Sequence, residues 1–491
     1  MKAKISQCVL ASAIYVSAVH AADSTFVRDS VLGLFDSSPS SGKGIGADRL
    51  SVELPMPFNL ESAQPTADGL VRTVPTAGLQ AADLGIWPIV RRAVDWHPVI
   101  QDAQAQLSSQ IGYIDAAKAG YYPQISAGVN NSLQGGLYGN ASVLSFSASQ
   151  MLYDFGKVGA AKSYAEAGYF KQQAQSLLAV DDLATRAAQA TVAVHRYQEM
   201  LRIAGEHVSG IADVVEIVRM RSSGGVSTQS ELLQAVSRLD GARGNLQQVS
   251  TALDQSREHL RTLVGADAAP ESVVVEDEKL RQAWAAAAEP EFNRIPRVLV
   301  ALADRAAAAA QAAGARADRY PTLSLGAGTS KALSGIDPNN PGSDGWSNTV
   351  TLNLSAAIYQ GGEKMARSRA ANDALVAAQA RIEAASLEVR ASLRGLKAQV
   401  AGIERRLSTQ KTRVASIEQA SSLFREQYKL GTRSVLDVLN SVDEVYQARS
   451  EALNAEHDLW GSFVDYFNAG GMARDVYALT NTSIQNLDIE P

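Results

Sequence analysis

The sequence predicts an α+β membrane protein built from two tandem repeats, each with a helix, a β-hairpin and a long α-helical hairpin. Three observations support this fold class. The chain of 491 residues matches itself in register over much of its length. Each copy contains two short segments in which apolar and polar residues alternate, and a long proline-free stretch follows them. Alternation with a period of two is typical of strands, whereas a long stretch without proline favours helix.

The internal repeat is visible in prolines, glycines and aromatic residues. Pro98 and Pro123 match Pro296 and Pro321 at an offset of 198. An insertion in the second copy then changes the register, and the pairs Tyr153/Tyr359, Gly225/Gly431 and Leu233/Leu439 share an offset of 206. Because one register holds over a long stretch, we interpret the pattern as a two-fold tandem repeat rather than a chance match.

The domain boundaries follow from this repeat and from the N-terminal residues. We predict a signal peptide at 1–21, an N-terminal periplasmic extension at 22–85, a first repeat at 86–291, a second repeat at 292–475 and a C-terminal tail at 476–491. Two lysines, a short apolar run and small residues before a cleavage point favour a signal peptide over a membrane anchor. No uninterrupted run of 18 apolar residues follows, so we expect no transmembrane helix.

The alternating segments form one predicted hairpin in each repeat. In the first, Ile125, Ala127 and Val129 alternate with polar residues, and so do Leu144, Phe146 and Ala148. In the second, the alternation covers Leu323 to Ala327 and Val350 to Ile358. About ten residues suit a membrane-crossing strand with apolar side chains toward lipid and polar ones toward a wet lumen. A small soluble sheet that covers a core would show the same alternation.

The proline-free stretches predict helices from Lys157 to about Met220 and from Lys364 to about Lys429. At 1.5 Å per residue each helix is on the order of 100 Å long. A glycine-containing turn follows each one, and a second helix then returns. Helices of this length cannot fill a compact globule, so each must pack along its partner as a hairpin. Four strands cannot close a barrel and open edges are not tolerated in lipid, so if the strands lie in a membrane, several copies must combine them around a conduit.

Composition argues against other classes of function. The net charge of −6 provides no basic excess for nucleic acid. The histidines are scattered without metal-ligand spacing, and Cys8 is the only cysteine. We therefore expect no enzyme activity, no cofactor and no metal. No nucleotide-binding motif is present, so energy for transport must come from a partner.

Two sequence motifs resemble those of TolC-type outer-membrane export channels. The stretch from Tyr428 to Leu439 is similar to the helical-hairpin tip of that family, and Tyr153 to Lys157 is similar to its strand-to-helix junction. The resemblance implies a homotrimer with a shared twelve-stranded β-barrel in outer-membrane lipid and an α-helical tunnel in the periplasm. It also implies two protein partners, a periplasmic adaptor and an inner-membrane transporter of the ABC type.

The resemblance also assigns a periplasmic gate to the tips. Tyr428 and Arg433 match positions whose bonds hold the entrance closed, and Glu231 is the candidate acid that Arg433 meets on a neighbouring tip. Asp437 matches the first acidic position of a constriction ring. Asn440 stands where the second acid is expected, which weakens the ring of negative charge. Without the resemblance, Arg433 and Asp437 would be interpreted as exposed charged residues that keep the tip soluble.

The sequence also suggests structural and binding roles for two further sets of residues. Gly225, Val226, Gly431 and Thr432 are predicted to form the tip turns and to contact the adaptor. Tyr122, Tyr153, Tyr320 and Tyr359 lie at strand ends, as members of an interfacial aromatic girdle would. Ordinary packing at the junction is the alternative for these tyrosines.

The predicted function is an outer-membrane channel of a tripartite export system. The absence of a lipid anchor, the junction from Met151 to Lys157 and the tip from Gly225 to Thr228 resemble the branch that serves type I secretion, so we expect a protein cargo such as a large adhesin. Multidrug efflux through the same architecture is one alternative. An exported structural coiled-coil protein without a pore is another.

Overall fold

The structure is a computed structural model that describes residues 85–133, 140–265, 272–287, 290–334 and 345–480, with 270, 482–484 and 487–489. These residues all belong to the compact unit Leu60–Pro491. The predicted signal peptide at 1–21 and the predicted extension at 22–85, except its last residue, lie outside the described residues. Residues 134–139 and 335–344 of the two β-hairpin loops also lie outside them.

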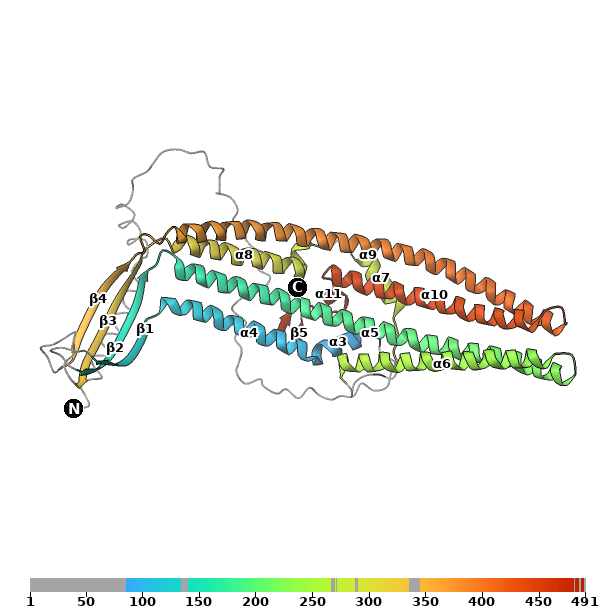
Figure 1. Ribbon diagram of the computed structural model, residues 1–491. Coiled ribbons are helices and arrows are strands. Elements are labelled where there is room, and N and C mark those ends of the chain that lie inside the picture. Colours follow the sequence, from blue (N-terminus) through green and yellow to red (C-terminus); the bar gives the residue numbers. More distant parts are fainter. Residues whose placement is uncertain are drawn as a thin grey trace, which may run out of the picture. The chain divides into compact units, whose positions relative to one another are not determined.

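The main elements occur twice in the same order, as the internal repeat predicts (Figure 1). The first copy contains α4 (Pro98–Lys118), β1 (Gln124–Leu133), β2 (Asn140–Tyr153), α5 (Lys157–Ser223) and α6 (Gln229–Val264). The second contains α8 (Pro296–Ala317), β3 (Thr322–Ser334), β4 (Ser347–Ser355), α9 (Glu363–Lys429) and α10 (Val435–Ala469). The smaller elements are α3 (Ile86–Trp96), η2 (Ala119–Tyr121), α7 (Asp277–Ala286), η4 (Phe292–Arg294), α11 (Ala473–Val476), β5 (Thr482–Ile484) and β6 (Leu487–Ile489).

The two longest helices begin at equivalent glycines. α5 and α9 each contain 67 residues, and Gly156 and Gly362 before them have positive φ angles of 93° and 85°. A side chain would strain this left-handed backbone, which explains the glycines. Asp154 accepts hydrogen bonds from the N–H groups of Gly156 and Val158 and thereby satisfies the first turn of α5.

The four long strands form one antiparallel sheet in the order β1-β2-β3-β4. β2 pairs with β3, so the sheet joins the two repeats. The register places Ile125 opposite Ala148 and Leu325 opposite Leu352, so apolar side chains share one face. Serine, glycine, threonine and asparagine line the other face. The strand β4 ends at Ser355, although the alternation that predicted it runs on to Ile358.

The apolar face of this sheet is exposed. Ile125 is 78% exposed and Val350 is 75% exposed, and Leu352 and Leu354 are also exposed. No element in the described part of the chain packs over this face as a core would require. The alternative of a soluble sheet that covers its own core is therefore wrong for the described residues.

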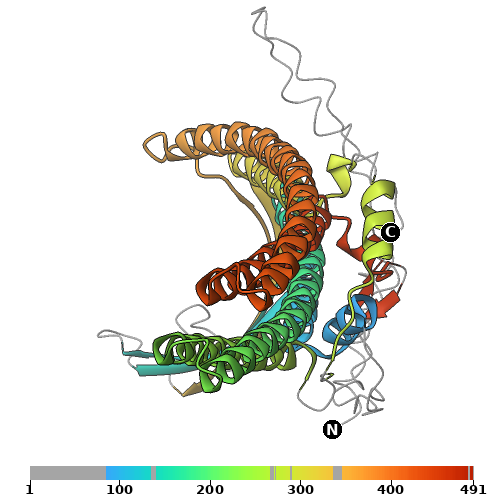
Figure 2. The same ribbon diagram turned by 90° about the vertical axis from the view of Figure 1, so that its right-hand side faces the viewer.

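The long helices pack along one another. α5 contacts α4, α6, α8 and α10, while α9 contacts α8 and α10. Figure 2 shows these helices in one curved layer, with α3 and α7 on its outer side. The largest buried side chains include Phe463, Tyr466 and Phe467 near the end of α10. Trp284 of α7 stacks on Phe463 at a centroid distance of 5.0 Å, so α7 is anchored to this core.

Helix α8 meets a looser criterion for a membrane span than the one applied to the sequence, but it packs among the other helices. It is long and apolar enough to cross a membrane by length and composition alone. The sequence criterion counted only uninterrupted apolar runs, and Arg297, Asp304 and Arg305 interrupt this helix. Its apolar character comes mainly from alanine, which allows α8 to pack closely against both α5 and α9.

Candidate functional site

The candidate gate consists of the two turns that end the helical hairpins. Gly225 and Gly431 have positive φ angles of 73° and 80°, as their predicted role in the turns requires. The N–H of Val226 bonds to the carbonyl of Arg221 at 2.8 Å, and the N–H of Thr432 bonds to that of Gln427 at 3.0 Å. The two tips therefore share one turn geometry.

Each turn is followed by a capping box that starts the returning helix. Thr228 and Glu231 form the box of α6, and Ser434 and Asp437 form that of α10. In both boxes the carboxylate accepts a hydrogen bond from the N–H of the capping residue. Glu231 and Asp437 therefore have a local structural role in addition to the role in the gate predicted for them.

Tyr428 is enclosed between the two hairpins and is only 4% exposed. It belongs to a buried apolar cluster formed by Ile211, Val214, Val215, Val218, Ala235, Leu239, Ala242, Tyr428, Val435, Val438, Leu439 and Val442. Its hydroxyl lies 3.5 Å from Oγ of Ser227 in the turn of the first hairpin. Tyr428 therefore connects the second hairpin to the first.

Arg221 completes this connection and was not identified from the sequence. Its Nη1 donates to the backbone carbonyl of Tyr428 at 3.0 Å, and its guanidinium carbon lies 4.9 Å from the centre of the Tyr428 ring. The sequence did contain one signal for this role, because Arg221 lies near a helix C-terminus and a cation there commonly binds free backbone carbonyls. The sequence could not show that the carbonyl belongs to the other hairpin.

Arg433 contacts its own hairpin. Its Nε donates to Oε1 of Gln427 at 3.0 Å, and its guanidinium carbon lies 4.3 Å from the centre of the Phe424 ring. Its Nη1 lies 3.8 Å from Oδ2 of Asp437. Within this chain Arg433 and Glu231 are not brought together, because Glu231 caps α6.

Asn440 takes part in a polar link between the hairpins. Its Oδ1 accepts a hydrogen bond from Nη2 of Arg238 at 3.3 Å. The same guanidinium pairs with Asp443 at 2.8 Å, and the other carboxylate oxygen of Asp443 lies 2.8 Å from Nε2 of His207. Asp443 of α10 therefore connects to both α5 and α6, a role that the sequence analysis missed.

Two further ionic bridges join α10 to both α5 and α9. Arg449 pairs with Glu206 of α5 at 2.7 Å and with Glu418 of α9 at 2.5 Å. Nearer the strands, Asp458 pairs with Arg196 of α5 at 2.8 Å and with Arg406 of α9 at 2.9 Å. These bridges have opposite charge patterns, with a cation at the centre of one and an anion at the centre of the other.

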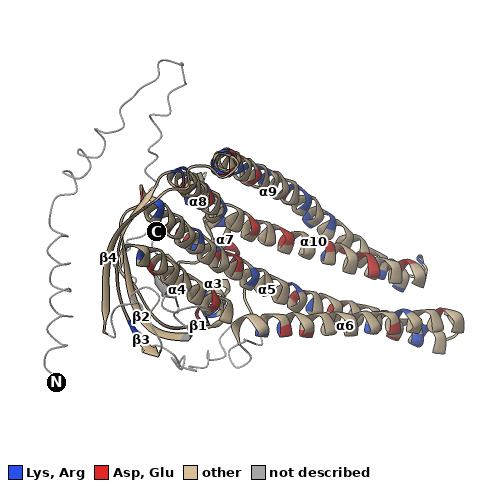
Figure 3. Cartoon of the chain, turned by 60° about the vertical axis from the view of Figure 1, so that its left-hand side comes forward, with Lys and Arg blue, Asp and Glu red and all other residues tan. Residues whose placement is uncertain are grey.

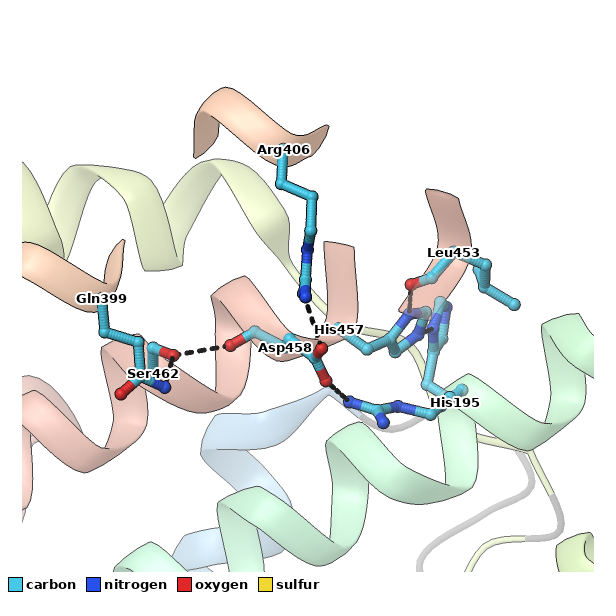
Figure 4. A network of polar contacts seen from close by, with 8 residues as sticks. His195, Gln399, Arg406, Leu453, His457, Asp458 and Ser462 are labelled. Carbon is cyan, nitrogen blue, oxygen red and sulfur yellow. Dashed lines mark hydrogen bonds and ion pairs between the residues drawn. The ribbon is translucent and has the colours of Figure 1, made fainter. Parts of the chain in front are cut away.

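The bridge at Asp458 lies beside a pair of histidines, of which His457 is buried and His195 half-buried (Figure 4). Nδ1 of His195 is 2.9 Å from Nε2 of His457, and Nδ1 of His457 is 2.8 Å from the carbonyl of Leu453. Burial lowers the pKa of His457 to about 4, and burial also lowers the pKa of His195. An open groove of about 560 Å³ lies next to Asp458, between α5, α9 and α10, and both polar and apolar residues line it.

The predicted aromatic residues lie at the helical end of the sheet. Tyr122, Tyr153, Tyr320 and Tyr359 are each exposed by half or more. Phe155 was not predicted with them. Its ring lies 4.7 Å from that of Tyr153 and 5.1 Å from that of Tyr320, so it joins the two repeats in one aromatic stack.

Among the residues that the structure describes, no group of three or more His, Cys, Asp or Glu side chains could hold a metal ion. The site is therefore characterised by turns, an enclosed tyrosine and polar bridges between helical hairpins. A sheet with an exposed apolar face, continued by two long helical hairpins, is the architecture of an outer-membrane channel protein.

The family model described as outer membrane efflux protein matches residues 89–266 and 292–463. The chain belongs to this family and is located in the outer membrane. The predicted resemblance to TolC-type channels is thereby confirmed.

Individual relatives agree with this assignment. The chain is 23% identical to outer membrane protein TolC of Escherichia coli over 420 residues, which covers 80% of this chain and 84% of TolC. It is 28% identical to protein CyaE of Bordetella pertussis over 354 residues, which covers 64% and 72% of the two chains. The crystal structure of CusC superposes with a TM-score of 0.70 at 18% identity and covers 83% of this chain and 98% of CusC.

Proposed function

We propose that three copies of the chain form an outer-membrane channel, in which twelve strands close a barrel and the helices continue as a periplasmic tunnel. The exposed apolar face of the sheet is the observation that carries this proposal. Within the described sheet, β1 and β4 each have a strand partner on one side only. In lipid an open edge leaves backbone groups without hydrogen bonds, so neighbouring copies would pair β4 with β1.

Opening at the tips is the second part of the proposal. The contact between Tyr428 and Ser227 at 3.5 Å and that between Arg433 and Asp437 at 3.8 Å are long, so they can be exchanged at small cost. Val226 and Leu430 are exposed apolar residues in the two turns. A periplasmic adaptor that covers these turns would bias the tips toward an open arrangement.

For the cargo we propose protein substrate, delivered by an ABC-type transporter through the adaptor in type I secretion. The junction from Met151 to Lys157 and the tip from Gly225 to Thr228 support this branch by their resemblance to secretion channels. Multidrug efflux is the second candidate, and the description of the matched family favours it. A coiled-coil protein without a pore finds no support in the family assignment.

The proposal extends to the ends of the chain. We propose that residues 1–21 are removed on export and that residues 22–85 remain in the periplasm. The two repeats, 86–291 and 292–475, would then pair with each other, and the tail 476–491 follows them in the chain. N-terminal sequencing of protein purified from outer membranes tests the first point. A mature chain that begins with Met1 would contradict it.

The decisive experiment compares surface and culture-fluid proteins from a deletion strain and its parent. Loss of one or a few very large proteins, restored by the gene on a plasmid, would support type I secretion. An unchanged protein profile together with raised drug accumulation would support efflux and count against the protein cargo.

A further inference from the structure

One charged residue stands alone in the sheet. In the described residues of the sheet β1-β2-β3-β4, Lys331 of β3 is the only Lys, Arg, Asp or Glu residue, and Figure 3 shows the other three strands of this sheet without charge. The strands therefore contain no carboxylate that could pair with it. A lone charge on a membrane-crossing sheet is costly unless it reaches the polar headgroup region.

The strand register assigns Lys331 to the apolar face. Lys331 is opposite Leu144 of β2, just as Ala327 is opposite Ala148. Along β3, Lys331 is in phase with Leu325 and Ala327, so its side chain leaves the sheet on their side. It lies at the end of the strand that is remote from the helices. Lys331 thus lies near the end of the apolar face, where only Leu333 follows it in phase on β3.

Two aromatic residues lie at the same level. The centres of the Phe146 and Trp346 rings are 6.5 Å apart, and both side chains are exposed. Nζ of Lys331 lies 6.0 Å from the centre of the Trp346 ring. An amphipathic ring beside a lysine is typical of a membrane–water interface, where the ring lies among headgroups and the amine reaches toward water.

The position of Lys331 along β3 fits one edge of a membrane-spanning band. Leu323 and Lys331 are eight residues apart on β3, a distance of about 26 Å along the strand. Because barrel strands are tilted by about 35–45°, this length spans about 20 Å of an apolar band about 25 Å tall, and the long lysine side chain extends toward the headgroups. At the level of Leu323, its pairing partner Tyr153 begins the aromatic stack that Phe155 and Tyr320 complete. Aromatic residues therefore border the apolar band at both ends.

We propose that Lys331, supported by Trp346, binds the phosphate group of a phosphorylated lipid in the outer leaflet of the outer membrane. The inference rests on the proposed barrel, because that barrel turns the apolar face toward lipid and the strand ends toward the cell exterior. A lysine ammonium is a compact positive charge with three donors, which suits a phosphate. In the trimer the three copies of Lys331 form three equivalent sites around the barrel.

The test measures equilibrium binding of lipid A with a fluorescent acyl chain to the full-length protein in detergent. Lipid A with both phosphates is compared with the same lipid after one phosphate is removed. The wild-type protein should bind the bisphosphorylated form about fivefold more tightly, which is the effect of one lysine near a charged membrane surface. Lys331→Gln should abolish this preference, and Lys331→Arg should restore most of it.

Lys429→Gln is the matched control, because Lys429 is an exposed lysine at the opposite end of the helices whose ion pair is with Glu426. This variant should keep the wild-type preference. An unchanged preference in Lys331→Gln would overturn the lipid contact, and so would displacement of the lipid by inorganic phosphate at equal concentration.

Planar-bilayer conductance of the same preparations separates this inference from the channel itself. A wild-type protein that neither inserts nor conducts would overturn the proposed channel and the lipid contact together. A Lys331→Gln protein that conducts normally but keeps the wild-type lipid preference would overturn only the lipid contact.

Discussion

Arg221, at the end of one helical hairpin, donates a hydrogen bond at 3.0 Å to the backbone carbonyl of Tyr428, at the end of the other. The same guanidinium lies over the Tyr428 ring. Because Tyr428 is buried among apolar residues of both hairpins, this contact links the two tips directly. Opening of the tips must break it or carry both hairpins together.

We expect Arg221→Ala to open the tips. The lost hydrogen bond and ring contact are together worth on the order of 1–2 kcal/mol, which corresponds to about a tenfold change in the ratio of open to closed tips. Single-channel conductance in planar bilayers should rise. Arg219→Ala is the control, since Arg219 is exposed and pairs with Glu216 on its own helix. Equal conductance in both variants would show that Arg221 does not hold the gate.

Arg433→Ser should raise the conductance less than Arg221→Ala does. In this chain Arg433 is about half exposed and contacts only its own hairpin, and exposed ion pairs contribute at most about 1 kcal/mol. Single-channel conductance in planar bilayers measures this effect. The double variant that combines Arg221→Ala with Arg433→Ser completes a double-mutant cycle for the two residues. If Arg433→Ser alone opened the channel fully, its main partner would have to lie on a neighbouring copy, as the predicted contact with Glu231 requires.

Asn440→Asp should increase the preference of the channel for cations. The substitution supplies a carboxylate at the position where the family resemblance predicts a second acid, and three copies bring three such charges together. The reversal potential in a salt gradient measures the change. Asn372→Asp adds the same charge to an exposed position on α9 far from the tips and should have a smaller effect. Equal shifts in the two variants would place the selective region elsewhere.

The stability of the helical domain should fall as the pH drops from about 6.5 toward 4. Burial lowers the pKa of His457 to about 4, below the ordinary histidine value, so the unfolded chain binds the proton more readily in this window. The loss at the acid end is on the order of 3 kcal/mol. Thermal unfolding followed by helical circular dichroism in detergent measures it.

His457→Asn should reduce this pH dependence even if it lowers the stability at neutral pH. His259→Asn is the control, because His259 is an exposed histidine on α6. If the slope between pH 6.5 and 4 were the same in His457→Asn as in the wild type, the titrating group would be another one, such as His195.

Much of the fold could be predicted because its signals are local. The alternation around Phe146 and Leu352 identified strands with one apolar face, and the register confirms that these residues share it. The C-terminal end of β4 was predicted less accurately. In β4 the alternation continues into the segment before Gly361, where the backbone leaves the sheet.

The candidate site was predicted only in part. The turns at Gly225 and Gly431 have the backbone that their glycines indicated. The contacts of Arg221 and of Asp443 could not be predicted, because their partners lie more than 200 residues away in the sequence. Asp437 was predicted as a gate residue. Its position three residues after Ser434 instead favours the local contact of a capping box, in which its carboxylate accepts a hydrogen bond from the N–H of Ser434.

By itself the sequence determined the repeat, the two faces of each strand, the starts of the long helices and the turns at the tips. These features depend on residues within a few positions of one another, where sterics and capping act. Only the tertiary structure decided that β2 pairs with β3, that Arg221 reaches Tyr428 and that Asp458 bridges α5 and α9. A shift of one residue turns a helix face by about 100°, so contacts between 67-residue helices depend on how they pack along their whole length.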